Sequence, residues 1–346
     1  MGGNKMKYII YGTGNYGRNA YETLKDKINI VGFSDPFTKQ VQFSTNGLPV
    51  LFPDEINRDC ISIIATGHRY WKDIEKKLDS LQIKHITYDK LIFDMFRPEL
   101  ESVYSLLSDE LSKKTLDEVI KARTIGDSSG LRNVYCDNQY FAIPEILTKV
   151  GGREWFIDAG AYVGDMVEKY IIDRVEHFDK IFAFEPATKQ FNALKIRAKR
   201  LTEEWALRDD AIQCIKAGLS DKSKVIKIMQ GNVPGGTFIT ETNENNSDYD
   251  ILQAYSLDDF IEESSYELNG KIGFIKADIE GEEIKLLKGS VETIKKYKPR
   301  LAICLYHNPF DFIRIPLYIK ELCPDYKMVI RHHTFEFNET VLYCYI

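Results

Sequence analysis

Two acidic residues and two glycines are spaced as in a site for a ribose-containing ligand. Asp158 ends an apolar stretch and is followed by Gly160 and Gly164, and Glu185 lies 27 positions after Asp158 at the end of the next apolar stretch. Glycines let the backbone turn sharply and approach a ligand closely, and an acid at the second strand end can accept both ribose hydroxyls. The alternative is a packing turn followed by a surface glutamate, but two positions agree with one binding geometry.

Three titratable residues later in the chain have the chemistry to take a proton from a hydroxyl group. Asp278 and Glu280 stand two positions apart, so their side chains share one face if the strand continues and diverge if the chain turns after Ile279. Glu280 would otherwise favour the N-terminus of the next helix. His307 ends the following strand, either as a neutral base or as a hydrogen-bonded strand-end histidine. No spacing signature supports a metal ion at these residues, and none is expected.

A second glycine turn lies near the start of the chain. Gly12, Gly14 and Gly17 form a GxGxxG pattern before a helical stretch, and Asp35 follows at the end of the next apolar stretch. Both features match the dinucleotide fingerprint, in which amides at a helix start face the diphosphate and the acid binds a ribose. No catalytic half follows, so a nucleotide bound here would be recognised rather than transformed.

Alternating apolar strands and amphipathic helices must position both turns. Up to about residue 90 the alternation is typical of parallel βαβ units. A helical stretch without a clear strand follows. A second alternating series then runs to an antiparallel hairpin at the C-terminus. The sequence therefore predicts an α/β protein of three parts: a Rossmann-like accessory domain (1–90), a helical connector (91–150) and a larger α/β domain (151–346).

Composition excludes several other classes of protein. The chain has 346 residues, 44% of them hydrophobic, which excludes a disordered or fibrous protein. A net charge of −6 argues against a dedicated nucleic-acid binder, which needs a basic face. No apolar stretch approaches the roughly 20 residues of a membrane helix, and residues 1–7 carry no apolar signal core. Six scattered cysteines without a CxxC pair fit a reducing compartment, so a cytoplasmic location is expected.

The second alternating series resembles the FkbM family of S-adenosylmethionine-dependent methyltransferases. The resemblance covers about residues 140–346, and the segments that carry it in matching order and spacing are FIDAGAYVGD, IFAFEP, AGLSD, SLDDF, FIKADIEGEEIKLLKG and LAICLYH with a DFIRIP helix. It implies the class I methyltransferase fold, which is Rossmann-like with a seven-stranded sheet and an antiparallel terminal hairpin. It also implies S-adenosylmethionine as the cofactor and a small-molecule or glycan acceptor.

The resemblance also assigns residues to the cofactor. The residues that it places along the methionine and ribose are Asp158, Gly160, Ala161, Tyr162 and Gly164. Glu185 would take the ribose hydroxyls with Pro186 beside it, and Ala217 and Gly218 would lie near the adenine. The position before Ala217 is often small and polar in this family, whereas this chain has Lys216.

The acceptor side is expected to involve the titratable residues of the later strands. Asp278 and Glu280 would lie beside the reacting methyl group, and Asp278 or His307 is expected to accept the hydroxyl proton. A polar loop from Gly231 to Asp248 is long for a compact domain. Loops of this length are usually functional or disordered, so it is either a lid over the acceptor or a disordered segment.

The N-terminal region resembles the small nucleotide-binding domain found ahead of some bacterial sugar-modifying acyltransferases. That resemblance implies a pocket for a nucleotide sugar, and the GxGxxG turn is also compatible with NAD. We therefore expect an accessory module that holds a nucleotide-linked acceptor or a regulatory nucleotide, or one that only packs and contributes to assembly.

Three functions are compatible with these features. The first is methyl transfer from S-adenosylmethionine to an oxygen of a sugar, a glycan precursor or a related small hydroxyl compound. The second is an NAD-dependent sugar-nucleotide oxidoreductase or epimerase. The absence of a catalytic half after the N-terminal glycine turn argues against this function. The third is a non-catalytic nucleotide-sensing protein, which would form no S-adenosylhomocysteine. The sequence leaves the acceptor, the pathway, metal dependence and homo-oligomer formation open.

Overall fold

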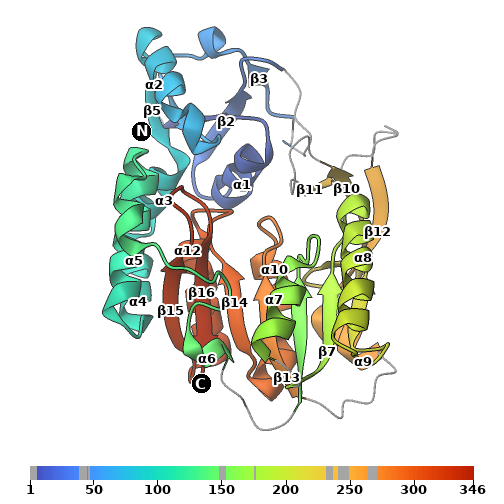
Figure 1. Ribbon diagram of the computed structural model, residues 1–346. Coiled ribbons are helices and arrows are strands. Elements are labelled where there is room, and N and C mark those ends of the chain that lie inside the picture. Colours follow the sequence, from blue (N-terminus) through green and yellow to red (C-terminus); the bar gives the residue numbers. More distant parts are fainter. Residues whose placement is uncertain are drawn as a thin grey trace.

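The computed structural model describes residues 6–38, 45, 47–147, 153–174, 177–230, 237–240, 249–263 and 271–346. Within those residues the chain forms three β-sheets, of five, four and seven strands. Figure 1 shows the N-terminal sheet above the seven-stranded sheet, with the connector helices along one side. No helix in the described ranges has the length and apolar character needed to cross a membrane.

The N-terminal sheet is parallel throughout, with two α-helices packed on it. Its elements are β1 (Lys7–Tyr11), α1 (Asn15–Leu24), β2 (Asn29–Ser34), β3 (Val50–Leu51), η1 (Pro53–Glu55), β4 (Cys60–Ile64), η2 (His68–Tyr70), α2 (Trp71–Ser80) and β5 (Lys84–Thr87), where η marks a 3-10 turn. The strand order is β3-β2-β1-β4-β5. The central strand β1 buries Ile9, Ile10 and Tyr11 in succession, as is typical of a strand covered on both faces.

Helices fill the connector between the two larger sheets. They are α3 (Tyr88–Met95), α4 (Arg97–Leu106), α5 (Glu110–Ile125), the 3-10 turn η3 (Ser129–Val134) and α6 (Pro144–Leu147). Helix α5 begins after Asp109, whose carboxylate accepts the amide of Ser112, and ends at Gly126 with a φ of 68°. It packs along the edge of the larger sheet, where the Ser112 hydroxyl accepts the amide of Ile330 at 2.9 Å.

The larger sheet contains five parallel strands and a C-terminal antiparallel hairpin. Its strands are β6 (Glu154–Ala159), β7 (Phe178–Phe184), β8 (Ile212–Ile215), β13 (Lys271–Ala277), β14 (Arg300–Cys304), β15 (Lys327–His332) and β16 (Thr340–Tyr345). The order is β15-β16-β14-β13-β6-β7-β8, and β16 runs antiparallel to both of its neighbours. The predicted seven-stranded sheet with an antiparallel terminal hairpin is confirmed.

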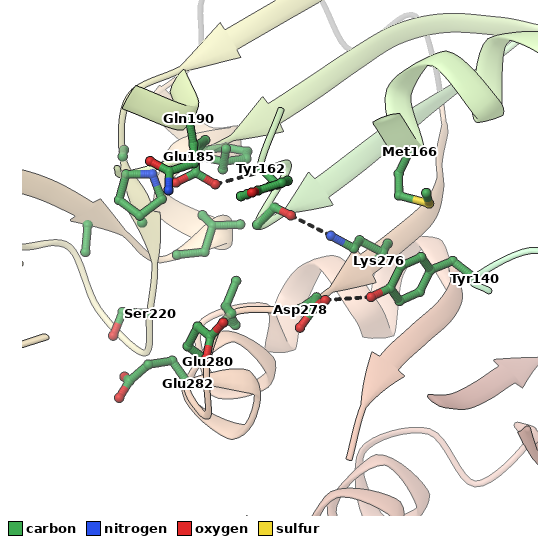
Figure 2. Close-up of a pocket in the computed structure, with 18 of the residues that line it drawn as sticks. Tyr140, Tyr162, Met166, Glu185, Gln190, Ser220, Lys276, Asp278, Glu280 and Glu282 are labelled. Atoms are coloured by element: carbon green, nitrogen blue, oxygen red, sulfur yellow. Dashed lines mark hydrogen bonds between the residues drawn. The ribbon is translucent and has the colours of Figure 1, made fainter. Parts of the chain in front are cut away.

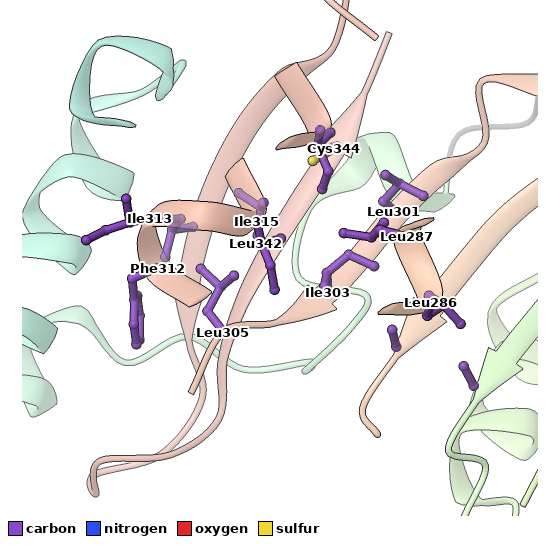
Figure 3. Packing of buried hydrophobic residues seen from close by; sticks show 14 of the residues in the cluster. Leu286, Leu287, Leu301, Ile303, Leu305, Phe312, Ile313, Ile315, Leu342 and Cys344 are labelled. Atoms are coloured by element: carbon purple, nitrogen blue, oxygen red, sulfur yellow. The ribbon is translucent and has the colours of Figure 1, made fainter. Parts of the chain in front are cut away.

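Helices pack on both faces of this sheet. They are α7 (Asp165–Arg174), α8 (Thr188–Glu204), α9 (Leu257–Glu263), α10 (Glu283–Lys288), α11 (Val291–Tyr297) and α12 (Asp311–Leu322). On one face, Leu287 of α10, Ile303 of β14 and Phe312 of α12 are fully buried in one apolar cluster (Figure 3). Since both faces are covered, the carboxyl ends of the parallel strands form the edge that is open to a ligand.

A four-stranded sheet adjoins the larger one, with the order β11-β10-β12-β9. Its strands are β9 (Gly218–Leu219), β10 (Lys224–Gln230), β11 (Thr237–Thr240) and β12 (Tyr249–Tyr255). The loop from Gly231 to Asp248, predicted to be either a lid or a disordered segment, falls largely on residues 231–236 and 241–248, which lie outside the described residues. Between them, β11 pairs with β10 in antiparallel register, so part of the predicted loop is a strand.

The N-terminal region meets the larger sheet at the carboxyl ends of its parallel strands. In α1, the Asn19 side-chain amide donates to the carbonyl of His307 at 3.5 Å. At the start of α3, the Tyr88 hydroxyl donates to Oδ1 of Asn308 at 2.9 Å. Helix α1 therefore lies directly over the strand ends (Figure 1).

Candidate functional site

A cavity of about 490 Å³ lies at the carboxyl edge of the seven-stranded sheet. This volume is within the roughly 300–1,000 Å³ that small-molecule sites occupy. Most of its wall comes from strand ends, and Asn15 and Arg18 of α1 together with Tyr140 of the connector complete it. Figure 2 shows Glu185 on one side of this cavity and Asp278 on another.

The glycine turn after β6 passes directly against the end of β13. Gly160 has a φ of 78°, and a Cβ atom there would overlap the carbonyl oxygen of Asp278. Gly164 has a φ of 82°, and its Cβ would lie 2.8 Å from a methyl group of α8. Both glycines are therefore required for packing as well as for the turn itself. Gly160 and Tyr162 line the cavity, whereas Ala161 is buried beneath it.

Asp158 lies under this turn and pairs with a buried lysine. Its carboxylate is fully buried, and Nζ of Lys276 lies 3.1 Å from Oδ1. Lys276 also donates a hydrogen bond of 2.6 Å to the carbonyl of Gly160 (Figure 2). Burial raises the pKa of Asp158, although the charge of Lys276 opposes this rise. Asp158 thus supports the turn from below, whereas the family resemblance places it along the cofactor.

Glu185 ends β7 and faces the cavity. Its Oε2 accepts the amide of Tyr162 at 2.9 Å, and its Oε1 accepts the amide of Ala187 at 2.8 Å. Each carboxylate oxygen keeps a further lone pair that a ligand hydroxyl can use. Burial raises the pKa of Glu185 to about 7, although the two amide hydrogen bonds oppose the rise. This is the placement that a ribose-binding carboxylate requires.

A mostly apolar wall stands next to Glu185. Its residues are Pro186, Ala217, Gly218, Ile226 and Ala254. Such a surface suits the face of an aromatic base, which buries apolar area when it packs against aliphatic side chains. Lys216, the departure from the family pattern, is exposed next to the buried Ala217.

Asp278 is surrounded by hydrogen-bond donors. Tyr140 donates to Oδ2 at 2.6 Å (Figure 2), and Tyr306 donates to Oδ1 at 3.0 Å. Nε2 of His307 lies 3.4 Å from Oδ1. Burial alone would raise the pKa of Asp278, but His307, Lys276 and the two tyrosines together lower it below its ordinary value. Asp278 is therefore a charged hydrogen-bond acceptor at neutral pH and a weak base.

His307 lies behind Asp278. Its side chain is 9% exposed, and Nδ1 lies 3.0 Å from Oε1 of Glu283. Nε2 faces Asp278 and Glu280 at 3.4 and 3.8 Å. Burial opposes protonation of His307, but the three carboxylates outweigh it and raise the pKa to about 10. His307 is thus an imidazolium at neutral pH, which differs from the neutral imidazole that a general base requires.

Glu280 lies in the turn after β13 and lines the cavity. Its φ is 58°, a left-handed conformation that is uncommon for a residue with a side chain, so the chain turns after Ile279. The side chains of Glu280 and Asp278 nevertheless do not diverge, because both carboxylates lie within 4 Å of Nε2 of His307. Burial raises the pKa of Glu280 to about 7, with Asp278 adding to the rise and His307 opposing it. The side chain is still 42% exposed, so a ligand can reach the carboxylate.

Asp278, Glu283 and His307 place possible metal-ligand atoms within 4.8 Å of one another. The three carboxylates around His307 favour its protonated form, so His307 would have to release a proton before it could coordinate a metal ion. The absence of a metal remains a prediction from the sequence.

The N-terminal glycine turn connects β1 to α1. A Cβ atom on Gly17 would overlap the carbonyl oxygen of Gly12, so these two glycines pack against each other, whereas Gly14 has open space around it. Asp35 already has partners, since one oxygen accepts the Thr13 hydroxyl at 2.7 Å and the other accepts a backbone amide at 2.9 Å. These hydrogen bonds take one lone pair on each oxygen of the carboxylate that the dinucleotide pattern assigns to a ribose.

Several residues of the cavity are missing from the sequence-based set, among them Tyr140, Lys276 and Tyr306. Lys276 carries a signal in the sequence, because a lysine inside the apolar run GFIKA is seldom buried without a partner. The two tyrosines carry none, since aromatic residues of this kind are common in cores.

Comparison with known families identifies the larger part of the chain. The family model described as the methyltransferase FkbM domain matches residues 158–337, which is just over half of the chain. The chain belongs to the FkbM methyltransferase family. The match begins at Asp158 and includes Glu185 and Asp278 of the cavity. No curated protein sequence matches this FkbM methyltransferase.

A second family model, described as C2185-like N-terminal, matches residues 4–88. This match covers the N-terminal sheet and helix α1 of the FkbM family member. The expected resemblance to the domain ahead of sugar acyltransferases is not confirmed by it.

The fold is also supported by a solved structure. The crystal structure of a methyltransferase FkbM from Methylobacillus flagellatus KT is 21% identical with a TM-score of 0.60, and the alignment covers 99% of this chain and 90% of that one. A putative rRNA methylase from Clostridium thermocellum is 10% identical with a TM-score of 0.35, covering 57% and 89%. A SAM-dependent methyltransferase from Aquifex aeolicus is 12% identical with a TM-score of 0.30, covering 56% and 83%. The class I methyltransferase fold is supported by the first of these.

Proposed function

We propose that this FkbM family member transfers the methyl group of S-adenosylmethionine to a hydroxyl oxygen of a sugar, a glycan precursor or a related small compound. One observation carries the proposal: a single cavity contains both the strand-end carboxylate Glu185 and the carboxylate Glu280, whose pKa is near neutral. The first suits a ribose, and the second suits removal of a hydroxyl proton.

The cavity fits S-adenosylmethionine. Glu185 offers a lone pair on each oxygen to the two ribose hydroxyls, and the wall around Ala217 suits the adenine. Asp165 and the other carboxylates of the cavity favour a cofactor with positively charged amino and sulfonium groups. When bound, S-adenosylmethionine supplies a methyl group that is already activated by its sulfonium.

Glu280 is the residue that we assign to proton removal. A general base acts best when its pKa is close to the operating pH, which is the case for Glu280. Its left-handed backbone conformation is the kind of local strain that occurs at functional sites. Asp278 and His307 are less suited, because the first has a lowered pKa and the second is already protonated.

The wall around Glu280 is polar, which favours an acceptor with several hydroxyl groups. Its other polar side chains include Asn15, Gln139, Glu282 and Glu339. Amide and carboxylate oxygens accept the hydroxyl hydrogens of a sugar and can align one hydroxyl with the methyl group.

The proposal assigns no nucleotide to the N-terminal turn. Neither NAD nor a nucleotide sugar is supported there by the family comparisons. Asp35, the acid that such a ligand would use, is hydrogen-bonded to the Thr13 hydroxyl and to a backbone amide.

Two measurements test the proposal. Calorimetry should detect binding of S-adenosylmethionine and of S-adenosylhomocysteine to the full chain. Incubation with methyl-labelled S-adenosylmethionine and a panel of sugars, nucleotide sugars and other hydroxyl compounds should label an oxygen, as located by mass spectrometry. Failure to bind either cofactor form would contradict the proposal, and labelling confined to nitrogen or carbon acceptors would contradict its choice of oxygen.

A further inference from the structure

Arg123 on α5 is a buried guanidinium that contacts three parts of the chain. Its side chain is 1% exposed. Nε donates to Oδ1 of Asp89 at 2.7 Å, and Nη2 donates to the hydroxyl of Tyr16 at 3.0 Å. Nη1 donates to the carbonyl oxygens of Tyr306 and Phe337 at 3.1 and 2.9 Å. One side chain of the connector thus joins the N-terminal region to two loops of the larger sheet.

Asp89 supplies the charge that balances Arg123. Its carboxylate is fully buried at the start of α3, accepts the Tyr16 hydroxyl, and lies 3.4 Å from Nε2 of His68. Burial alone would raise the pKa of Asp89, but Arg123 and the hydrogen bonds outweigh it and lower the pKa. A buried ion pair is often no more stabilising than apolar residues of similar volume.

The groups that Arg123 contacts belong to the wall of the cavity or adjoin it. Tyr16 lies in the first turn of α1 next to Asn15, which lines the cavity. Tyr306 lines the cavity as well. Its backbone carbonyl accepts a hydrogen bond from Arg123, and its side-chain hydroxyl donates one to Asp278 at 3.0 Å. We call the part of the cavity around Asp278, Glu280 and Tyr306 the acceptor end. Arg123 therefore contacts two walls of this end.

Further contacts hold the same junction together. The Tyr88 hydroxyl of α3 donates to Asn308, which follows the end of β14. The ring of His68 stacks on Phe337 with 4.4 Å between centroids and 6° between planes. Phe337 stands two residues before Glu339, which also lines the cavity. The N-terminal region is thus fixed against the loops that form the acceptor end.

We infer that Arg123 is a positioning residue for the acceptor end of the cavity, and that the N-terminal region is a fixed wall of that site. Through Tyr16, Arg123 holds the first turn of α1 beside the cavity. Through the carbonyl of Tyr306, it fixes the segment that presents the Tyr306 hydroxyl to Asp278. The inference rests on the proposed function, which assigns this end of the cavity to the acceptor. The contacts of Arg123 do not depend on that assignment.

Three variants of the full chain test the inference. Arg123→Lys keeps a positive charge for Asp89 but lacks the planar fork that contacts Tyr16 and Tyr306 together. The double variant Asp89→Asn/Arg123→Met removes both charges and leaves no unpaired buried ion. Arg58→Met removes an exposed arginine of the N-terminal region and is the matched control.

The readout is the imidazole of His307, which directly follows Tyr306. Nitrogen-edited NMR spectra, assigned with His307→Gln, report its pKa, which is about 10 in the parent. In Arg123→Lys and in the double variant we expect its proton affinity to fall by about tenfold or more, toward the value of an ordinary histidine. The double variant should unfold at a somewhat lower urea concentration than the parent, because the carbonyls of Tyr306 and Phe337 lose their donor. Arg58→Met should change neither quantity.

Two outcomes would overturn the inference. Folded variants that keep the His307 signals and pKa of the parent would show that Arg123 only stabilises the fold. A loss of S-adenosylhomocysteine affinity of about tenfold or more would show that its effect is not confined to the acceptor end, because we expect the variants to bind within about twofold of the parent. If the parent itself binds no S-adenosylhomocysteine, the proposed function fails, while the His307 measurement still decides the inference.

Discussion

Lys276 on β13 and Asp158 on the adjacent strand β6 form an ion pair of 3.1 Å beneath the cavity. Both residues are almost completely buried, at 2% and 0% exposure. Lys276 also holds the carbonyl of Gly160 with a hydrogen bond of 2.6 Å. Since Asp278 follows two positions after Lys276, one strand both supports the glycine turn and presents the charged group of the acceptor end.

Replacing Lys276 by methionine is expected to destabilise the protein by about 3–5 kcal/mol, because the carboxylate of Asp158 stays buried without its partner. Urea unfolding measures this free energy. The double variant Asp158→Asn/Lys276→Met should regain most of the stability but bind S-adenosylhomocysteine less tightly, since the Gly160 carbonyl has lost its donor. Lys295→Met on the exposed side of α11 is the control and should unfold like the parent. A change below about 1 kcal/mol in Lys276→Met would contradict this role.

Glu185→Gln is expected to weaken S-adenosylhomocysteine binding by about 1–3 kcal/mol, because a buried ribose loses a charged hydrogen-bond acceptor. Since the pKa of Glu185 is about 7, binding to the parent should weaken as the pH falls through this value and the carboxylate gains a proton. Calorimetry on both sides of that pH should show this dependence in the parent and not in Glu185→Gln.

The matched control for that experiment is Glu203→Gln, near the exposed C-terminal end of α8. It should keep both the affinity and the pH dependence of the parent. If Glu185→Gln bound the cofactor product as tightly as Glu203→Gln above the pKa, Glu185 would not belong to the binding site.

Glu280→Gln should lower turnover by about 10²–10⁴-fold while the affinity for S-adenosylhomocysteine stays near that of the parent. In the parent, the rate of methyl transfer should rise with pH through about 7 as Glu280 loses its proton. Steady-state rates on the acceptor found in the labelling screen measure both effects. Glu262→Gln, exposed on α9, should behave like the parent. Full turnover in Glu280→Gln together with a large loss in Asp278→Asn would reassign the base to Asp278.

His307 should make the folding stability depend on pH at alkaline values. Folding raises its pKa from 6.5 to about 10, so its stabilising contribution is complete below 6.5 and is lost as the pH rises through about 10. In this window the free energy of unfolding should fall by up to about 1.4 kcal/mol per pH unit. Urea unfolding at several pH values should show this slope in the parent and in His85→Gln, and a flatter one in His307→Gln. An unchanged slope in His307→Gln would assign the effect to another group.

The fold and the cofactor end could be predicted from sequence because they depend on local patterns. Each strand of the larger sheet is a short apolar run, and Glu185 ends one of them where a ligand-binding edge is expected. Lys276 could have been predicted by the same reasoning, since it is a charged residue inside such a run. The short strand β11, which pairs with β10, could not, because the residues around it in the sequence are mostly polar.

The acceptor end depends on contacts between distant residues, which spacing does not reveal. Tyr140 lies 138 positions before Asp278 and reaches it from the connector. The protonation of His307 depends on Glu283, which in the sequence is an ordinary residue at the start of a helix. Arg123 stands in an amphipathic helix where an arginine is usually exposed, and only the assembled structure shows its four hydrogen-bonding partners.

The position of Gly160 against the carbonyl of Asp278 has a consequence for how the chain is made. Strand β6 pairs with β13 through Ala159 and Ala277, which are 118 positions apart in the sequence. Until β13 has left the ribosome, the growing chain lacks two groups. One is the Asp278 carbonyl, against which Gly160 packs, and the other is Lys276, which neutralises Asp158. Contacts of such long sequence separation form late in folding. Ligand binding can therefore stabilise the enzyme only after most of the chain has been synthesised. Shorter nascent chains gain no stability from the ligand.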